Sequence, residues 1–125
     1  MINHVSFGTN DMARAKAFYD AVFAVLGLRF FKQDEAGVHY GTGEIQFSLV
    51  KPTDGAPASP GNGVHIAFAV RDRGMVRDFH RAAMEHGGVE DGAPGIRGKY
   101  DAHYYAAFVR DPDGNKIEAV THAAQ

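Results

Sequence analysis

The stretch His4-Val5-Ser6-Phe7 has a counterpart, His65-Ile66-Ala67-Phe68, that lies 61 residues further along the chain. The match continues over 25 aligned positions, six of which are identical, where chance would give about one or two. A repeat of this length indicates that one structural unit is used twice, so the fold is built from two similar halves. The repeat also places a histidine at the same position in both copies.

The first half is predicted to begin with a strand and a helix. Residues 2–8 alternate between apolar and polar, which is typical of a strand, and Asn10 or Asp11 can cap the helix that follows. Apolar residues recur in that helix every three or four positions, and Gly27 predicts its end. Three short strands are expected after it, over 28–34, 37–42 and 44–50.

The second half repeats this order after a segment rich in proline and glycine, residues 51–63, which indicates a linker. The looser segment 89–102 marks a sixth strand only weakly. The turn Asp111-Pro112-Asp113-Gly114 joins the last two strands. The elements predicted here are a strand at 64–70, a helix at about 72–86, and strands at about 103–110 and 115–121.

These elements predict an α+β fold of two tandem βαβββ modules, with helices outside a curved mixed sheet. We expect one domain over residues 1–125, with the first module at about 1–50, the linker at 51–63 and the second module at about 64–122. Neither module alone can cover both faces of its sheet. The two sheets are therefore expected to combine around a shared concave space.

The composition excludes several classes of function. With 45% apolar and 22% charged residues, a net charge of −2 and scattered Lys and Arg, the chain has no clustered basic surface for nucleic acid. Its longest apolar run is too short for a bilayer span, and its N-terminus lacks the pattern of a signal peptide. We therefore predict no nucleic-acid or membrane partner and a cytoplasmic location. The absence of cysteine excludes thiolate ligands and thiol nucleophiles.

Four residues with nitrogen or oxygen donor atoms are paired by the repeat. His4 matches His65, and Gln46 matches Glu118 at an offset of 72 that allows for an insertion. Because side chains alternate across a strand, all four are expected on the faces away from the helices, among small side chains that leave volume for an ion. Two imidazoles and a carboxylate form a common open metal site. The competing interpretation is a scaffold that binds ligands without a metal.

A second group of polar and aromatic residues lies before the later strands and in the inserted segment. These side chains are candidates for lining the cavity, for hydrogen bonds to substrate oxygens and for positive charge. The alternative interpretation is an aromatic core with a solvated basic loop. The candidates are His39, Tyr40, Arg97, Lys99, Tyr100, His103, Tyr104 and Tyr105.

Five stretches together resemble a known superfamily over nearly the whole chain. They are His4-Val5, Asp11-Met12-Ala13-Arg14-Ala15 through Phe18-Tyr19, Leu26-Gly27-Leu28, Val64-His65-Ile66-Ala67-Phe68 and Asp111-Pro112-Asp113-Gly114-Asn115-Lys116-Ile117-Glu118. The chain resembles the vicinal-oxygen-chelate superfamily, which includes glyoxalase I, bleomycin- and fosfomycin-resistance proteins and extradiol dioxygenases. These motifs are specific for the superfamily and not for one of its members.

The resemblance implies a divalent metal ion (Zn, Ni, Mn or Fe) at His4, Gln46, His65 and Glu118. Many glyoxalase I proteins have Glu where this chain has Gln46. The resemblance also implies a small-molecule substrate and a homodimer. The site is then formed either within one chain or across the interface, where His4 and Gln46 of one subunit meet His65 and Glu118 of the other.

The function expected from these observations is that of a metal-dependent lyase or isomerase of the glyoxalase type. Such an enzyme binds two oxygens of a small substrate and moves a proton, with Glu118 as the catalytic base. One alternative is an antibiotic-resistance or small-molecule-binding protein, with or without a metal. Another is an Fe(II) extradiol-type dioxygenase, although such enzymes usually contain four of these units and this chain contains two.

Overall fold

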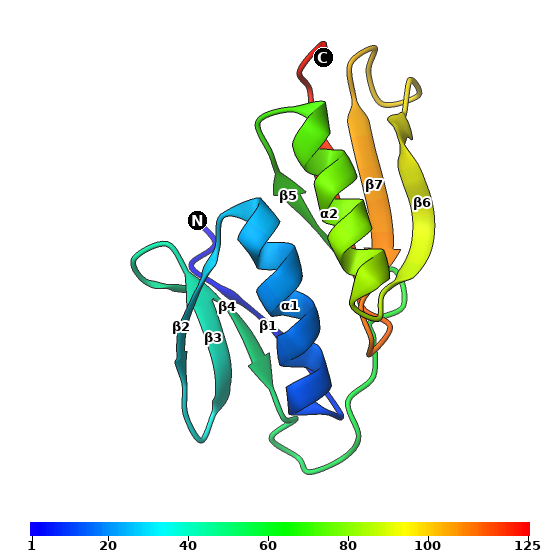
Figure 1. The fold of residues 1–125 in the computed structure, drawn as a ribbon. Coiled ribbons are helices and arrows are strands. Elements are labelled where there is room, and N and C mark those ends of the chain that lie inside the picture. The colour runs from blue at the N-terminus through cyan, green and yellow to red at the C-terminus, as the bar shows by residue number, and fades with distance from the viewer.

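The computed structural model describes residues 1–125 and contains eight strands and two helices (Figure 1). The first module comprises β1 (Val5–Gly8), α1 (Met12–Leu26), β2 (Arg29–Gln33), β3 (Gly37–Gly41) and β4 (Ile45–Val50). The second comprises β5 (His65–Ala69), α2 (Arg73–Glu85), β6 (Val89–Ile96), β7 (Tyr105–Arg110) and β8 (Lys116–Thr121). The order βαβββ occurs twice, which confirms the predicted α+β fold with two tandem modules.

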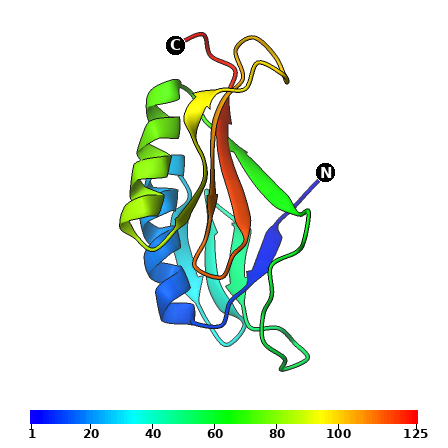
Figure 2. The ribbon, with the colours of Figure 1, turned by 90° about the vertical axis from the view of Figure 1, so that its right-hand side faces the viewer.

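The strands form two four-stranded sheets of identical topology, β1-β4-β3-β2 and β5-β8-β7-β6. In each sheet the first strand of the module pairs in parallel with the last, and the other pairs are antiparallel. No strand pair links β1 to β5, so the strands form two sheets and not one continuous sheet. Both helices lie on one side of the molecule and the sheets on the other (Figure 2).

The helices begin and end where local chemistry predicts. The carboxylate of Asp11 accepts a hydrogen bond from the backbone N–H of Arg14 and caps α1, and Asp72 caps α2 in the same way. Gly27 ends α1 in the left-handed region, with φ of 89°, where glycine carries no steric penalty. Neither helix has the length and apolar character needed to cross a membrane.

One hydrophobic core joins the two modules. It contains 17 buried residues drawn from both halves of the chain, and α1 packs against α2. Phe23 of α1 lies 4.8 Å from Phe47 of β4 and 5.6 Å from Phe68 of β5, measured between ring centroids. Burial of each such side chain stabilises the fold by roughly 1.5–3 kcal/mol. The shared core therefore fixes the modules against each other on their helix side.

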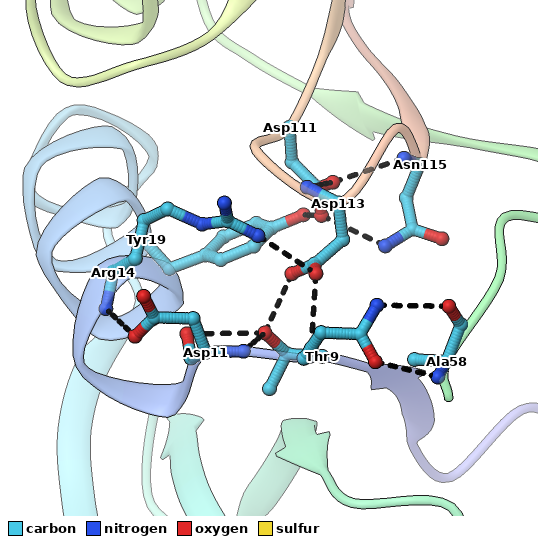
Figure 3. A network of polar contacts seen from close by, with 9 residues as sticks. Thr9, Asp11, Arg14, Tyr19, Ala58, Asp111, Asp113 and Asn115 are labelled. Carbon is cyan, nitrogen blue, oxygen red and sulfur yellow. Dashed lines mark hydrogen bonds and ion pairs between the residues drawn. The ribbon is translucent and has the colours of Figure 1, made fainter. Parts of the chain in front are cut away.

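A polar clamp, which we define as Thr9, Arg14, Tyr19, Asp111 and Asp113, reinforces this arrangement (Figure 3). Asp113 accepts hydrogen bonds from the Thr9 hydroxyl at 2.6 Å and from the Arg14 guanidinium at 3.1 Å. Asp111 accepts one from the Tyr19 hydroxyl at 2.6 Å. Both aspartates belong to the turn between β7 and β8, whereas their partners belong to the first module. These charge-assisted bonds tie the last turn of the chain to α1.

The sixth strand, β6, is irregular. Its pairing with β7 shifts register between Glu90 and Gly92 and again between Gly92 and Gly95, and it contains Pro94. Glycine and proline inside a strand mark bulges and lower the strand signal of a sequence. This explains why the segment 89–102 indicated a strand only weakly.

Candidate functional site

Three of the four predicted metal ligands line two separate cavities, one beside each sheet. His65 and Glu118 line a cavity of about 520 Å³ on the second sheet. His4 lines another, of about 510 Å³, on the first sheet. No three His, Asp or Glu side chains of one chain come close enough to hold an ion together. Within one chain, the structure therefore brings together two of the four predicted ligands.

The second-module cavity is built around the carboxylate of Glu118. This side chain is buried, yet both of its oxygens have partners: the His65 Nε2 atom lies 3.1 Å from Oε1, and the Tyr104 hydroxyl donates to Oε2 at 2.5 Å. Burial and the hydrogen bond to Glu118 raise the pKa of Tyr104 to about 12. The hydroxyl therefore remains a donor across the physiological range. The His65 side chain is 44% exposed, so its ring is open to a ligand from outside.

Three cations surround the same cavity. Arg97 donates to the carbonyl oxygens of Gly95 and Ala93, which orient its guanidinium over the ring of Phe108 at 5.3 Å. The Lys99 amine lies 5.2 Å from the ring centroid of Tyr100. Lys116, by contrast, contacts Asp91 at 3.5 Å. Arg97 and Lys99 have no carboxylate partner, and their charge is available to an anionic ligand.

The first-module cavity contains a chain of polar contacts behind His4. The His39 Nδ1 atom lies 2.7 Å from the Ser48 hydroxyl, and its Nε2 atom lies 2.8 Å from Asp34. His39 and Ser48 are 6% and 4% exposed, so these buried polar groups satisfy one another. His4 itself is exposed, and its Nδ1 atom contacts the Asn3 side chain at 2.8 Å.

Gln46 occupies a β-bulge. Tyr40 of β3 pairs with Phe47 of β4, but the next pair joins Gly41 to Ile45, which leaves Gln46 as the extra residue. Its Oε1 atom accepts hydrogen bonds from the backbone N–H and the hydroxyl of Thr42, both at 2.9 Å. The strict alternation expected for β4 stops at this bulge. Ile45 lines the His4 cavity and Gln46 does not.

Five of the eight predicted substrate-binding residues line one or other of the two cavities. Arg97, Lys99, Tyr100 and Tyr104 line the cavity of Glu118, and His39 lines that of His4.

The other three candidates lie outside both cavities. Tyr40 is buried on the helix side, where its hydroxyl donates to Asp20 at 2.7 Å. Tyr105 packs beneath the guanidinium of Arg73, 4.9 Å from its ring centroid. His103 lies in the exposed turn that precedes β7.

Sequence reasoning did not single out Ser48. In the first sheet Ser6 pairs with Ser48, and in the second Ala67 pairs with Glu118. Ser6 and Ala67 are equivalent in the 61-residue repeat, so Ser48 holds the strand position that Glu118 holds in the second module. This equivalence follows from the register of the parallel strand pairs, which cannot be read from the sequence alone.

Comparison with known proteins agrees with this fold. The sequence model of the glyoxalase/bleomycin resistance protein/dioxygenase superfamily matches residues 1–119. The chain belongs to this superfamily. Among solved structures, a glyoxalase/bleomycin resistance protein from Albidiferax ferrireducens T118 is 35% identical, with 95% of this chain and 96% of that chain covered and a TM-score of 0.85.

Two more distant superfamily structures share the fold. A lactoylglutathione lyase from Agrobacterium tumefaciens is 21% identical, with a TM-score of 0.67 over 97% of this chain and 92% of that chain. A glyoxalase-related enzyme from Fulvimarina pelagi is 19% identical, with a TM-score of 0.76 over 97% and 87%. At these identities the likeness concerns the fold alone. No curated protein matches the chain.

Proposed function

We propose that this superfamily member is a metal-dependent lyase or isomerase of the glyoxalase type, acting on a small anionic substrate in a site that two chains complete. The observation that carries the proposal is the pair of His65 and Glu118, 3.1 Å apart, in a cavity that Arg97 and Lys99 make positive. An imidazole and a carboxylate are two donors of an open divalent site, which needs three.

His4 is the third donor in this proposal, supplied by a second copy of the chain. His4 and His65 line different cavities of one chain, and the shared core and the polar clamp hold the two modules in that arrangement. A second copy can bring its His4 to His65 without disturbing either core. Ile2 and Val64, which flank the two histidines closely in sequence, are 79% and 58% exposed and offer apolar area for such a contact.

Different residues of the chain have different roles in the proposed reaction. A bound divalent ion supplies Lewis-acid polarisation of substrate oxygens. Glu118 is the base that accepts the substrate proton, and the Tyr104 hydroxyl orients its carboxylate. Arg97 and Lys99 bind the anionic end of the substrate, and the ring of Tyr100 covers it.

A subunit-mixing experiment tests this proposal through metal content. His4→Ala and His65→Ala are each expected to lose the ion, whereas the wild type binds about one per chain. When the two variants are unfolded together and refolded, half of the dimers are mixed, and one site in each keeps both histidines. The mixture should then recover about a quarter of the wild-type metal content.

The controls are each variant refolded alone and the refolded wild type. No recovery in the mixture, with wild-type dimers intact, would place the site within one chain. Wild-type metal content in either variant alone would remove that histidine from the site. Substrates can be sought with α-keto-aldehyde–thiol adducts, catechols and epoxide antibiotics, while oxygen consumption with Fe(II) would indicate dioxygenase chemistry.

A second candidate function is ligand binding without a metal, as in a small-molecule resistance protein. It is favoured by one observation: both oxygens of Glu118 have partners, and no buried side-chain nitrogen or oxygen in the chain lacks a hydrogen bond. Such a network is stable by itself. Elemental analysis that finds no ion in folded protein, together with binding of an anionic ligand, would favour this function.

A further inference from the structure

The cavity beside the first sheet contains a hydrogen-bonded relay that the proposed function leaves unused. His4, His39 and Ser48 all line this cavity of about 510 Å³. Ser48 lies against His39 at 2.7 Å, and His39 lies against Asp34 at 2.8 Å. The chain of contacts runs from Ser48, which is buried and lines the cavity, to the surface, where the Asp34 side chain is 37% exposed.

The direction of each hydrogen bond follows from the chemistry of Asp34. Its carboxylate also accepts from the backbone N–H groups of Ala36 and Gly37 and contacts Lys32 at 3.4 Å. The hydrogen bond with His39, first among these contacts, lowers the pKa of Asp34 to about 2. An ionised carboxylate can only accept, so the proton of neutral His39 lies on Nε2.

The Nδ1 atom of His39 is then an acceptor, and the hydroxyl of Ser48 must donate to it. This leaves the lone pairs of the Ser48 oxygen free to face the cavity. A serine hydroxyl that donates to an imidazole, which in turn donates to a carboxylate, is prepared to give up its proton while it accepts another.

The strand register also makes Ser48 the first-module equivalent of Glu118. Ser48 holds the position in the first sheet that Glu118 holds in the second, since they pair with the equivalent residues Ser6 and Ala67. Glu118, the proposed base on the second sheet, therefore has as its counterpart on the first sheet a serine that is hydrogen-bonded to His39.

We propose that Ser48, activated through His39 and Asp34, is a second proton-accepting group of the site, on the sheet that carries His4. The inference rests on the proposed function in one respect, because it requires a reaction that moves a proton. The Ser48 oxygen bonds to the proton that leaves the ligand, and its own proton passes to Nδ1 of His39. The resulting imidazolium is held by Asp34. No electrons are transferred to an external group, and the reverse movement returns the proton.

An acetylation experiment tests the relay without any substrate of the enzyme. In p-nitrophenyl acetate, attack by the Ser48 oxygen breaks the bond between the acyl carbon and the p-nitrophenyl oxygen, and a new bond joins that carbon to Ser48. His39 takes the hydroxyl proton, and p-nitrophenolate leaves. Mass spectrometry of the digested protein should find the acetyl group on Ser48, and absorbance follows the released phenolate.

Three variants and one internal control define the expected result. Ser48→Ala should lose the modification, His39→Gln should slow it about 100-fold, and Asp34→Asn should slow it about tenfold, because the imidazole loses its orienting partner. Ser6 lies beside Ser48 on the neighbouring strand and is exposed, but no histidine forms a hydrogen bond with it. Ser6 should therefore remain unmodified.

Three results would overturn the relay. They are acetylation of Ser6 as fast as that of Ser48, no acetylation of Ser48 at all, and an unchanged rate in His39→Gln. Metal content measured on the same samples keeps this test separate from the proposed function: an active relay in protein that binds no ion would refute the metal site alone, and an inert Ser48 in protein that binds the ion would refute the relay alone.

Discussion

The hydroxyl of Tyr104 donates a hydrogen bond of 2.5 Å to the Oε2 atom of Glu118, whose other oxygen contacts His65. Glu118 is 1% exposed, so these two neighbours are what make a buried carboxylate tolerable in the chain. A cation that binds to the Glu118 carboxylate must share that carboxylate with the Tyr104 hydroxyl. The hydrogen bond from Tyr104 therefore affects both the stability of the metal-free protein and its affinity for an ion.

The first prediction concerns Tyr104→Phe. Without the hydroxyl, Oε2 of Glu118 loses its donor, and the metal-free protein should be less stable by about 1–3 kcal/mol. The freed oxygen should keep the ion or bind it more tightly. Urea unfolding with and without Zn²⁺ measures both effects. In contrast, His65→Ala should lose the ion, and equal metal content in the wild type and His65→Ala would contradict the assignment of this ligand.

The second prediction concerns the positive side of the same cavity. Arg97→Gln removes a guanidinium that has no carboxylate partner, and should weaken binding of succinate, used as a simple anionic probe, by about tenfold or more. Titration followed by NMR measures the affinity. Arg81→Gln is the matched control, since Arg81 lies on α2 and pairs with Asp78. A similar loss in both variants would indicate an effect of net charge and not of this cavity.

The third prediction concerns the bulge that displaces Gln46. A Cβ atom on Gly41 would lie 1.7 Å from the carbonyl oxygen of Glu44, a backbone atom that cannot move alone. Gly41→Ala should therefore cost about 3 kcal/mol or more. Gly98→Ala, where no atom lies within 4 Å of the added Cβ, should change stability by less than about 0.5 kcal/mol. Equal unfolding midpoints for the two variants would show that the bulge is not needed.

Periodicity and the internal repeat were sufficient to predict the fold. Alternation located β1 and β5, helical spacing located both helices, and Asp11 and Gly27 marked the ends of α1 as predicted. These features are local, so a sequence displays them directly. The irregular β6 was harder, because Gly92 and Pro94 interrupt its pattern.

The site was harder to predict from the sequence, because it depends on how strands that are distant in the sequence align with one another. The repeat and the alternation of side chains along the strands put His65 and Glu118 in one predicted site, and the structure places these two residues in contact. The bulge at Gln46 could not be foreseen, since one extra residue in β4 changes which side chains reach the cavity. The contact between Asp34 and His39 could not be foreseen either, because it depends on the conformation of the turn between β2 and β3.

The fourth prediction concerns the polar clamp and alkaline pH. Tyr19 is fully buried and donates to Asp111 at 2.6 Å. Burial, followed by the charge of Asp111, raises the pKa of Tyr19 well above 10.0. A group whose pKa is raised by folding contributes its full stability below its unfolded pKa, and loses it as the pH rises through the folded pKa. The free energy of unfolding should therefore fall above pH 10.

Tyr19→Phe separates this contribution from the rest of the protein. At pH 7 the variant should be less stable than the wild type by about 1–3 kcal/mol, because Asp111 loses a buried donor. Above pH 10 the difference should shrink, since only the wild type still has this hydroxyl to ionise. Tyr40 remains in both proteins, and burial raises its pKa as well, so part of the alkaline loss persists in the variant. Urea unfolding between pH 7 and pH 11 gives both curves, with Tyr100→Phe, at an exposed tyrosine, as the control. A constant difference between wild type and Tyr19→Phe over this range would show that the hydroxyl of Tyr19 does not resist ionisation as its burial requires.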